Sequence, residues 1–215
     1  RATSNFGRAP PKMEGDAAVR RTITHAITTL DVCRRKWQAL HAPGIKSLTS
    51  CVNGRLTLAH AESNAWPPGF AAVRRGVACR ANRERQTATD AIQPVLTSLE
   101  EIVASMRVAT TTLRDKIHAT LRGRPLSAEV EQLIASVEAM VGSFERELQL
   151  RRAVAAEITD SEGGHAAPGW DASSRLLLSA WVLEPYLDNA KLDLLMESLA
   201  AEPSQSPNSR QRQKV

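Results

Sequence analysis

Apolar residues recur at alternating steps of four and three along much of the chain, which is the spacing of an amphipathic helix. The first row lies between residues 16 and 41 and consists of Val19, Ile23, Ala26, Leu30, Cys33, Trp37 and Leu40. Its average step of 3.5 residues is typical of a coiled-coil seam. Pro43 and Gly44 follow, and because proline disfavours helix at the residue before it, we expect the helix to end there. A second, shorter helix is predicted over about 45–60.

Residues 61–88 lack such a row. Pro67, Pro68 and Gly69 cannot continue a helix, and no apolar periodicity accompanies the arginines that come after them. We therefore predict a flexible, arginine-rich loop over about 61–88.

Regular rows return in the second half of the chain. One row predicts a helix over about 87–122, with Pro94 tolerated only near its first turn. The next helix should begin at Ser127, because Glu129 and Glu131 favour the positive end of the helix dipole. A short helix that covers 176–183 is predicted to begin after Asp171 as its N-cap and to stop or kink at Pro185, and a last helix is predicted over about 189–200. No segment has the alternation of a strand, so we predict an all-α fold: an elongated antiparallel helical bundle with coiled-coil-like long helices and disordered tails.

The composition suits one bundle with extensions. Of the 215 residues 42% are hydrophobic but only 4% are aromatic, so the core must be aliphatic. No apolar run approaches the roughly 18 residues needed to span a bilayer. We predict the bundle over 17–202, between a disordered basic segment (1–16) and a disordered basic tail (203–215), which is polar and poor in apolar residues. The chain begins with Arg1 rather than methionine, so we expect a fragment of a longer protein.

The positive charge is unevenly distributed. The whole chain carries a net charge of +5, while residues 1–21, 74–85 and 203–215 carry +3, +4 and +3, so the remainder is acidic. A basic protein suggests nucleic acid as a partner. Because the excess lies in segments predicted to be flexible, the folded body does not share it, and nucleic-acid binding is expected to be auxiliary.

The chain has few candidates for chemistry. It lacks the glycine-rich phosphate-binding motifs, the nucleophile-elbow motif and the paired histidines of metalloproteases. His60-Ala61-Glu62 matches the first half of the zinc-deaminase signature, but the P-C-x-x-C half is missing. We therefore predict no enzyme, no catalytic residue, no metal and no cofactor. Three scattered cysteines form no disulfide framework, which favours a reducing compartment, the cytoplasm or the nucleus.

Arg151 interrupts the apolar row of the helix that begins at Ser127. Its charged end can reach solvent while its stem packs, or it can pair with an acid of another helix or with a partner; an intrachain pair is the expected case. Trp181 and Tyr186 flank Pro185, either as core residues that close the end of the bundle or as interface residues, and we favour the core. The apolar rows themselves have two interpretations, an internal core or a groove for a partner helix.

Five arginines within twelve residues could contact phosphates with an affinity that falls as salt rises: Arg74, Arg75, Arg80, Arg83 and Arg85. No aromatic residues alternate with them, so a stacking platform for single strands is missing. The simpler interpretation is a solubilising loop or a docking site for an acidic partner. An accessory nucleic-acid-binding protein that uses these arginines and the basic tails is our alternative function.

Three motifs occur in an order and at spacings that resemble the cyclin-dependent kinase 2-interacting protein family. They are Lys36-Trp37-Gln38-Ala39-Leu40 with Gly44 following, Glu147-Leu148-x-Leu150-Arg151-Arg152-x-Val154-Ala155-x-Glu157, and Ser179-x-Trp181-x-x-x-Pro185-Tyr186. The resemblance extends loosely over residues 20–200, and residues 60–90 do not take part in it.

The resemblance implies a small, non-catalytic helical adaptor of the nucleus, with the cytoplasm as a further location. Its implied partners are cyclin-dependent kinases, ATR-interacting protein and spermatogenesis-associated AAA+ ATPases. The implied processes are DNA replication, the DNA-damage checkpoint, replisome turnover and maturation of the large ribosomal subunit. We take as partner-binding candidates Trp37, Leu40, Leu148, Arg151, Arg152, Glu157, Trp181, Pro185 and Tyr186. Ser204-Gln205 and Ser206-Pro207 in the tail are minimal target dipeptides for checkpoint and cyclin-dependent kinases.

Overall fold

The computed structural model describes residues 13–63, 66–121, 125–159 and 170–201. These residues form five helices and, within the described ranges, no strand: α1 (Met13–Glu62), α2 (Ala71–Leu121), α3 (Ala128–Thr159), α4 (Trp170–Leu183) and α5 (Asn189–Ala201). The predicted all-α bundle is confirmed. The coiled-coil character of the long helices stays a prediction.

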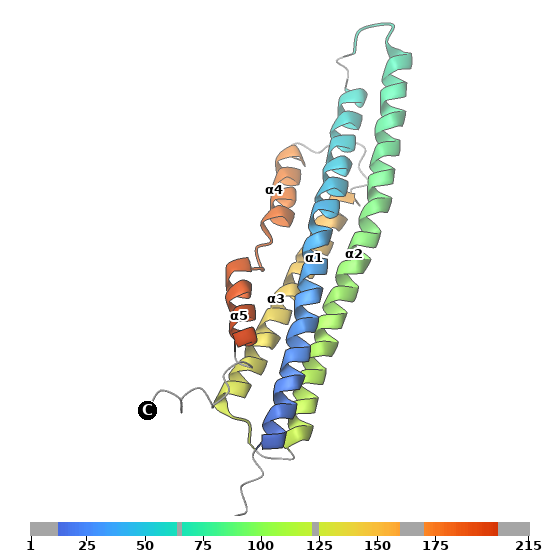
Figure 1. Ribbon diagram of the computed structural model, residues 1–215. Coiled ribbons are helices and arrows are strands. Elements are labelled where there is room, and N and C mark those ends of the chain that lie inside the picture. Colours follow the sequence, from blue (N-terminus) through green and yellow to red (C-terminus); the bar gives the residue numbers. More distant parts are fainter. Residues whose placement is uncertain (1–12, 64–65, 122–124, 160–169, 202–215) are drawn as a thin grey trace, which may run out of the picture.

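The two longest helices form an antiparallel hairpin that is the spine of the molecule (Figure 1). Helix α3 lies along this hairpin, and α4 and α5 follow one another on the outside of α3 and α1. The end of α3 reaches Arg55, whose guanidinium donates to the Ile158 carbonyl at 3.3 Å. Beyond that point the tip of the α1–α2 hairpin continues without α3 beside it.

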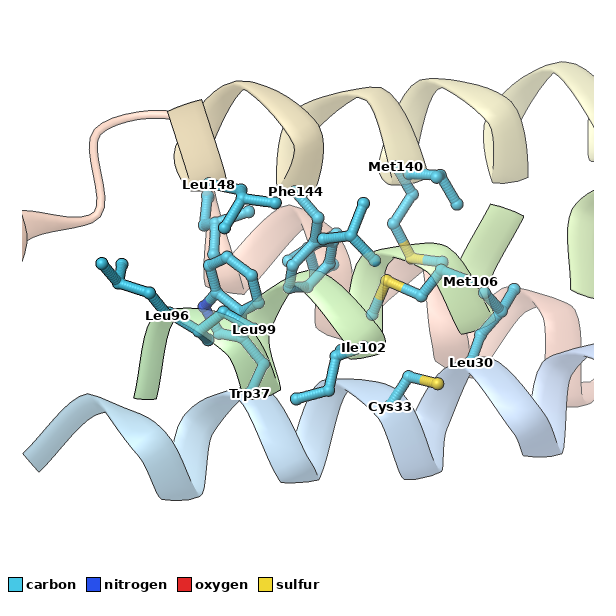
Figure 2. Close-up of a cluster of buried hydrophobic side chains, with 14 of the residues drawn as sticks. Leu30, Cys33, Trp37, Leu96, Leu99, Ile102, Met106, Met140, Phe144 and Leu148 are labelled. Atoms are coloured by element: carbon cyan, nitrogen blue, oxygen red, sulfur yellow. The ribbon is translucent and has the colours of Figure 1, made fainter. Parts of the chain in front are cut away.

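The core lies where α1, α2 and α3 face one another (Figure 2). Leu30 of α1 and Leu99 and Met106 of α2 have no exposed surface, and Phe144 of α3 is almost fully buried. Most of the other core residues are leucine, isoleucine, valine and alanine, as the composition predicts. Full burial of a large aliphatic or aromatic side chain stabilises the folded state by about 1.5–3 kcal/mol, so the three faces together hold the hairpin and α3 as one body.

The predicted break at Pro43 is wrong, because α1 continues through it as one helix of 50 residues. An internal proline removes a helical hydrogen bond and costs about 3 kcal/mol. The proline ring is exposed, so it displaces no core side chain, while Gly44 is buried against Trp181. Packing along the whole hairpin offsets this local cost. A prediction from neighbouring residues alone does not include such packing.

The predicted arginine-rich loop is also wrong for most of its length, because α2 begins at Ala71 and places residues 71–88 in a helix. The apolar row of this segment consists of alanines, Ala81 and Ala88, which continue into Ile92. Small residues allow α2 to approach α1 closely: a Cβ added to Gly54 would lie 3.1 Å from the Ala81 carbonyl oxygen. Pro94 therefore lies deep inside α2 rather than in a first turn.

Other predicted boundaries agree with the structure. Helix α3 begins directly after Ser127, whose hydroxyl accepts a hydrogen bond from the Val130 N–H at 3.4 Å, as an N-cap does. Helix α4 ends at Leu183, two residues before Pro185, and α5 begins at residue 189 as expected. The predicted N-cap of α4 is wrong, because the helix begins at Trp170 and already includes Asp171.

The predicted disordered ends lie largely outside the described residues. Residues 1–12 and the tail 203–215, with Ser204 and Ser206, are not described, while residues 13–16 are helical and not disordered as predicted. Among the helices described here, none combines the length and the apolar character that crossing a membrane requires.

Candidate functional site

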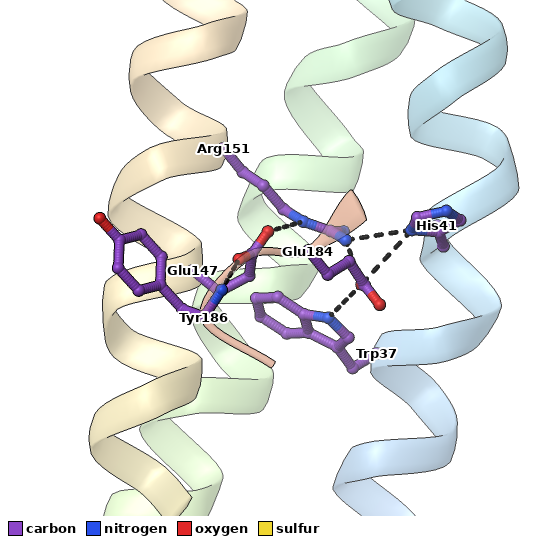
Figure 3. A network of polar contacts seen from close by, with 6 residues as sticks. All are labelled: Trp37, His41, Glu147, Arg151, Glu184 and Tyr186. Carbon is purple, nitrogen blue, oxygen red and sulfur yellow. Dashed lines mark hydrogen bonds and ion pairs between the residues drawn. The ribbon is translucent and has the colours of Figure 1, made fainter. Parts of the chain in front are cut away.

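A buried ionic cluster lies in the middle of the bundle, centred on Arg151 of α3 (Figure 3). The Arg151 side chain has no exposed surface. Its Nε donates to the carboxylate of Glu147, one turn earlier on α3, at 3.3 Å. Its Nη2 forms a short ion pair with Glu184, just after α4, and lies 3.1 Å from Nδ1 of His41 on α1. One guanidinium therefore joins three parts of the fold.

Two tryptophans enclose the same guanidinium. The Arg151 Cζ lies 4.8 Å from the ring centroid of Trp37 and 4.6 Å from that of Trp181. Cation–π contacts of this kind can reach about 2 kcal/mol when desolvated, and both rings are almost fully buried. Trp37 also donates its Nε1–H to Glu184 at 3.2 Å and meets Phe144 edge to face. The aromatic rings thus fix both the cation and one of its carboxylate partners.

Gly44 makes room for one of these rings. A Cβ built on Gly44 would lie 2.3 Å from Cζ2 of Trp181, which is closer than two non-bonded carbon atoms approach. Glycine weakens a helix interior by about 0.5–1 kcal/mol relative to alanine. This glycine therefore allows α4 to pack against α1 at the level of the ionic cluster.

The turn between α4 and α5 places Glu184 next to Arg151. Glu184 has a φ of 45°, in the left-handed region that a side chain disfavours, and it precedes Pro185. Such a conformation costs about 1–3 kcal/mol and persists only where its surroundings hold it. Here the Leu187 N–H donates to the Glu184 carbonyl at 2.8 Å, and the Tyr186 N–H donates to Glu147 at 3.3 Å. The turn and the ionic cluster therefore support each other.

Burial governs the charges of the cluster. It raises the pKa of Glu147, against the Tyr186 N–H and the Arg151 cation, which both favour the carboxylate. It lowers the pKa of Arg151, against the two carboxylates that favour the cation. Two carboxylates face one guanidinium, and Nδ1 of His41 lies 3.3 Å from Glu184. Such a cluster can hold helices in a fixed relative orientation.

The structure brings several sequence-predicted residues together. Trp37, Arg151 and Trp181 meet in the cluster, and Leu148 packs in the core beside them. All four are buried, so their place in the fold is the core and not an open partner surface. The intrachain pair expected for Arg151 is present, with Glu184 as the acid of another element. Neither Glu184 nor His41 is a candidate in the sequence analysis, because neither residue interrupts an apolar row.

The remaining candidates are accessible. Leu40 is half-buried, whereas Pro185 and Tyr186 are exposed and adjoin the cluster from outside. The core position expected for Tyr186 is therefore wrong, because only its backbone N–H reaches the cluster while its ring stays in solvent. Arg152 points away from the cluster and pairs with Glu100 of α2, its Nε donating at 2.8 Å. Glu157 is exposed near the end of α3. These residues do not form a single site.

An apolar surface lies on α4 and the start of α5. Its members are large apolar side chains with about half or more of their surface exposed: Leu176 (73%), Val182 (49%), Leu183 (74%), Tyr186 (47%) and Leu194 (67%). We call this set the α4–α5 surface. Sequence analysis missed its leucines, although a helix with apolar residues on every side is a signal that one side needs a second partner. A groove of about 740 Å³ between α3 and α5 continues the surface past Tyr186 and Leu194.

The arginines of α2 are spread around their helix. Arg74, Arg75 and Arg83 are exposed, and Arg80 pairs with Glu84 one turn on, at 2.8 Å. Arg85 is half-buried against α1. At 100° per residue the five do not share one face, so only some of them can contact one partner at once.

The residues that the structure describes contain no group of three or more histidine, cysteine, aspartate or glutamate side chains suited to a metal ion. No protein-family model matches this chain, and no curated protein matches it.

Proposed function

We propose that this protein is a non-catalytic helical adaptor, whose α4–α5 surface binds a protein partner. The exposed leucines of that surface carry the proposal. Large apolar patches on a folded protein mark interaction sites, and here three of the most exposed leucines, Leu176, Leu183 and Leu194, belong to the two shortest helices.

The ionic cluster supports this role from within. Glu184 and Trp181 hold the end of α4 on α1 and α3 through Arg151, so the leucines of α4 sit on a positioned helix. Leu176 and Leu183 are seven residues apart, which places them on the same side of α4 about 10 Å apart. A pair of anchors at this spacing is typical of helix-in-groove recognition.

The resemblance described above names the partners we propose. They are spermatogenesis-associated AAA+ ATPases first, then cyclin-dependent kinases and ATR-interacting protein, in the nucleus, with the cytoplasm as a further location. In this proposal the partner performs the ATP chemistry for ribosome maturation, replisome turnover or checkpoint signalling, and the present chain supplies a rigid docking surface.

Affinity purification from nuclease-treated extract at moderate salt, followed by mass spectrometry, tests the proposal. We expect AAA+ ATPases to be retained by the wild type and lost by a Leu176→Glu, Leu183→Glu variant. Val73→Glu, at an exposed aliphatic residue near the hairpin tip, is the matched control and should retain them. Loss in all variants, or retention in all, would contradict the proposed surface.

The exposed arginines at the start of α2 favour a second candidate function, accessory binding of nucleic acid. Arg74, Arg75 and Arg83 stand on a helix that projects past α3, where a phosphate backbone could reach them. This function predicts binding of DNA or RNA that falls steeply with salt. Replacement of Arg74, Arg75, Arg80, Arg83 and Arg85 by glutamine should abolish it, whereas the two leucine substitutions should not.

A further inference from the structure

A second groove runs between α1 and α2, away from the α4–α5 surface. It has a volume of about 740 Å³ and lies between the first half of α1 and the second half of α2. Ala26 and Leu113 are nearly fully buried and form part of its floor. Its rim is exposed: Val108 has 66% of its surface accessible, and Arg21 and Lys116 are open to solvent.

The walls of the groove are built from small side chains. They are Ala18, Thr22 and Thr29 on α1 and Ala104, Ser105, Ala109 and Thr112 on α2. Helix axes pack 8–10 Å apart according to the side chains between them, and small residues on both walls favour a close approach by a third helix. An apolar floor between small walls suits the leucines of such a helix.

The groove is long enough for an extended occupant. At Ser105 it adjoins a smaller hollow of about 420 Å³, which is lined by Cys33, Lys36 and Leu40 among others. Together the two run from Ala18 to Leu40 of α1, which corresponds to about 33 Å at 1.5 Å per residue. A helix of about 20 residues matches this length.

The charges along the groove select the sign of the occupant. Arg21, His25 and Lys116 line the larger part, and no carboxylate does among the described residues. The smaller part holds Lys36 and Glu101. Complementary charge at the rim of an interface determines which partner is accepted and how fast it binds.

We propose that the α1–α2 groove binds an acidic amphipathic helix of a partner protein. The apolar face of that helix would pack on Ala26, Val108 and Leu113, and its carboxylates would face Arg21 and Lys116. This goes beyond the proposed function, because the groove is a second surface, separate from the leucines of α4 and α5. An adaptor with two such surfaces can hold two proteins at once.

Synthetic peptides test the proposal directly on the full chain. The probe is a fluorescein-labelled helix of 20 residues with leucine and alanine on one face and glutamate elsewhere. The matched peptide has glutamine in place of every glutamate. Measured by fluorescence anisotropy, we expect the glutamate peptide to bind at least tenfold more tightly, with the difference shrinking as salt rises.

Two sets of variants place the binding site. Ser105→Trp fills the point where the two parts of the groove meet and should weaken binding at least tenfold. Thr111→Trp adds the same ring to an exposed residue of α2 outside the groove and should change affinity less than twofold. Arg21→Glu with Lys116→Glu should remove the preference for the glutamate peptide while keeping the circular dichroism of the wild type.

Several results would overturn the proposal. They are equal binding of the two peptides, no binding of either, or equal effects of Ser105→Trp and Thr111→Trp. A dimer in light scattering that Ser105→Trp dissociates would identify a second copy of the chain as the occupant instead. Leu176→Glu with Leu183→Glu should leave peptide binding unchanged, so failure of this proposal and failure of the proposed function give different results.

Discussion

Arginine occupies two opposite environments in this molecule. Arg151 is removed from water, enclosed by Trp37 and Trp181 and paired with Glu147 and Glu184. The arginines in the first half of α2 are mostly exposed, and the contact of Arg80 with Glu84 lies on the helix surface. The same side chain therefore fixes the relative positions of helices in one region and decorates a single helix in the other.

The difference lies in desolvation. A buried ion pair gains little over a well-packed apolar pair, but it leaves an uncompensated buried charge when one member is removed. An exposed ion pair is worth at most about 1 kcal/mol and is screened by salt. Burial thus ties α1, α3 and the α4–α5 turn to the one arrangement that brings Glu147 and Glu184 to Arg151, whereas the exposed arginines of α2 impose no such condition.

Arg151→Met should give the largest effect. The methionine keeps the apolar stem but leaves Glu147 and Glu184 without their cation, so the free energy of unfolding should fall by about 3–5 kcal/mol. Urea denaturation followed by circular dichroism measures it. Arg152→Met, next along α3 in a half-exposed pair with Glu100, is the control and should cost less than about 1 kcal/mol. Equal losses for the two variants would show that burial does not separate them.

Gly44→Ala should come second. Its methyl group would overlap the ring of Trp181, and overpacking of this kind costs about 1–3 kcal/mol. Gly142→Ala in α3 is the matched control, because a Cβ there meets nothing within 4 Å, and it should stabilise the helix by about 0.5–1 kcal/mol. Thermal unfolding of both variants measures the difference, and a stabilising Gly44→Ala would contradict the packing of Trp181 on α1.

The sequence predicts the helices around the Arg151 cluster better than it predicts the first half of α2. The apolar rows predict helix wherever leucine, isoleucine and valine carry them, and Ser127 and Pro185 mark true boundaries. The row in the first half of α2 is carried by alanines such as Ala81, which a search for large apolar residues does not detect. Tertiary packing also keeps Pro43 inside α1, and a rule based on neighbouring residues does not account for tertiary packing.

The sequence singles out only some residues of the candidate site. Trp37, Arg151 and Trp181 stood out as individual residues, and the structure brings them together. Their partner Glu184 lies 33 residues from Arg151 and belongs to a turn with a left-handed backbone. Periodicity places a residue on a face of its own helix, but it does not say which residue of another element lies opposite.

Glu147→Gln tests the electrostatics of the cluster through pH. Burial raises the pKa of Glu147, so the folded protein binds a proton more tightly than the unfolded chain, whose glutamate pKa is about 4.3. As pH rises from that value through the raised folded pKa, this group contributes progressively less to the free energy of unfolding. Across that pH window, the free energy of unfolding of the wild type should therefore fall relative to that of Glu147→Gln.

Urea titrations at a series of pH values measure this difference. In the Arg151→Met background the shift should be steeper, because the cation that favours the Glu147 carboxylate is gone. If the free energy of unfolding of the wild type rose relative to that of Glu147→Gln as pH rises over the same window, then pairing, and not burial, would dominate at Glu147.

Gly76→Ala examines the other region. Residue 76 is exposed within α2, and a Cβ there has open space around it. In a helix the substitution should raise the free energy of unfolding by about 0.5–1 kcal/mol and slow amide hydrogen exchange in residues 71–88. No change in exchange would favour the flexible loop that the sequence alone predicts.

The smallest effect is expected for Arg75→Gln and Arg83→Gln. Both arginines are exposed on α2, and glutamine has a similar helix propensity, so each should change the free energy of unfolding by less than about 0.5 kcal/mol. Urea denaturation beside Arg151→Met measures the contrast under identical conditions. A loss of several kcal/mol in either variant would mean that these side chains also hold helices together. A small loss of unfolding free energy would mean that the fold does not depend on the exposed arginines, so that they are available to bind a partner.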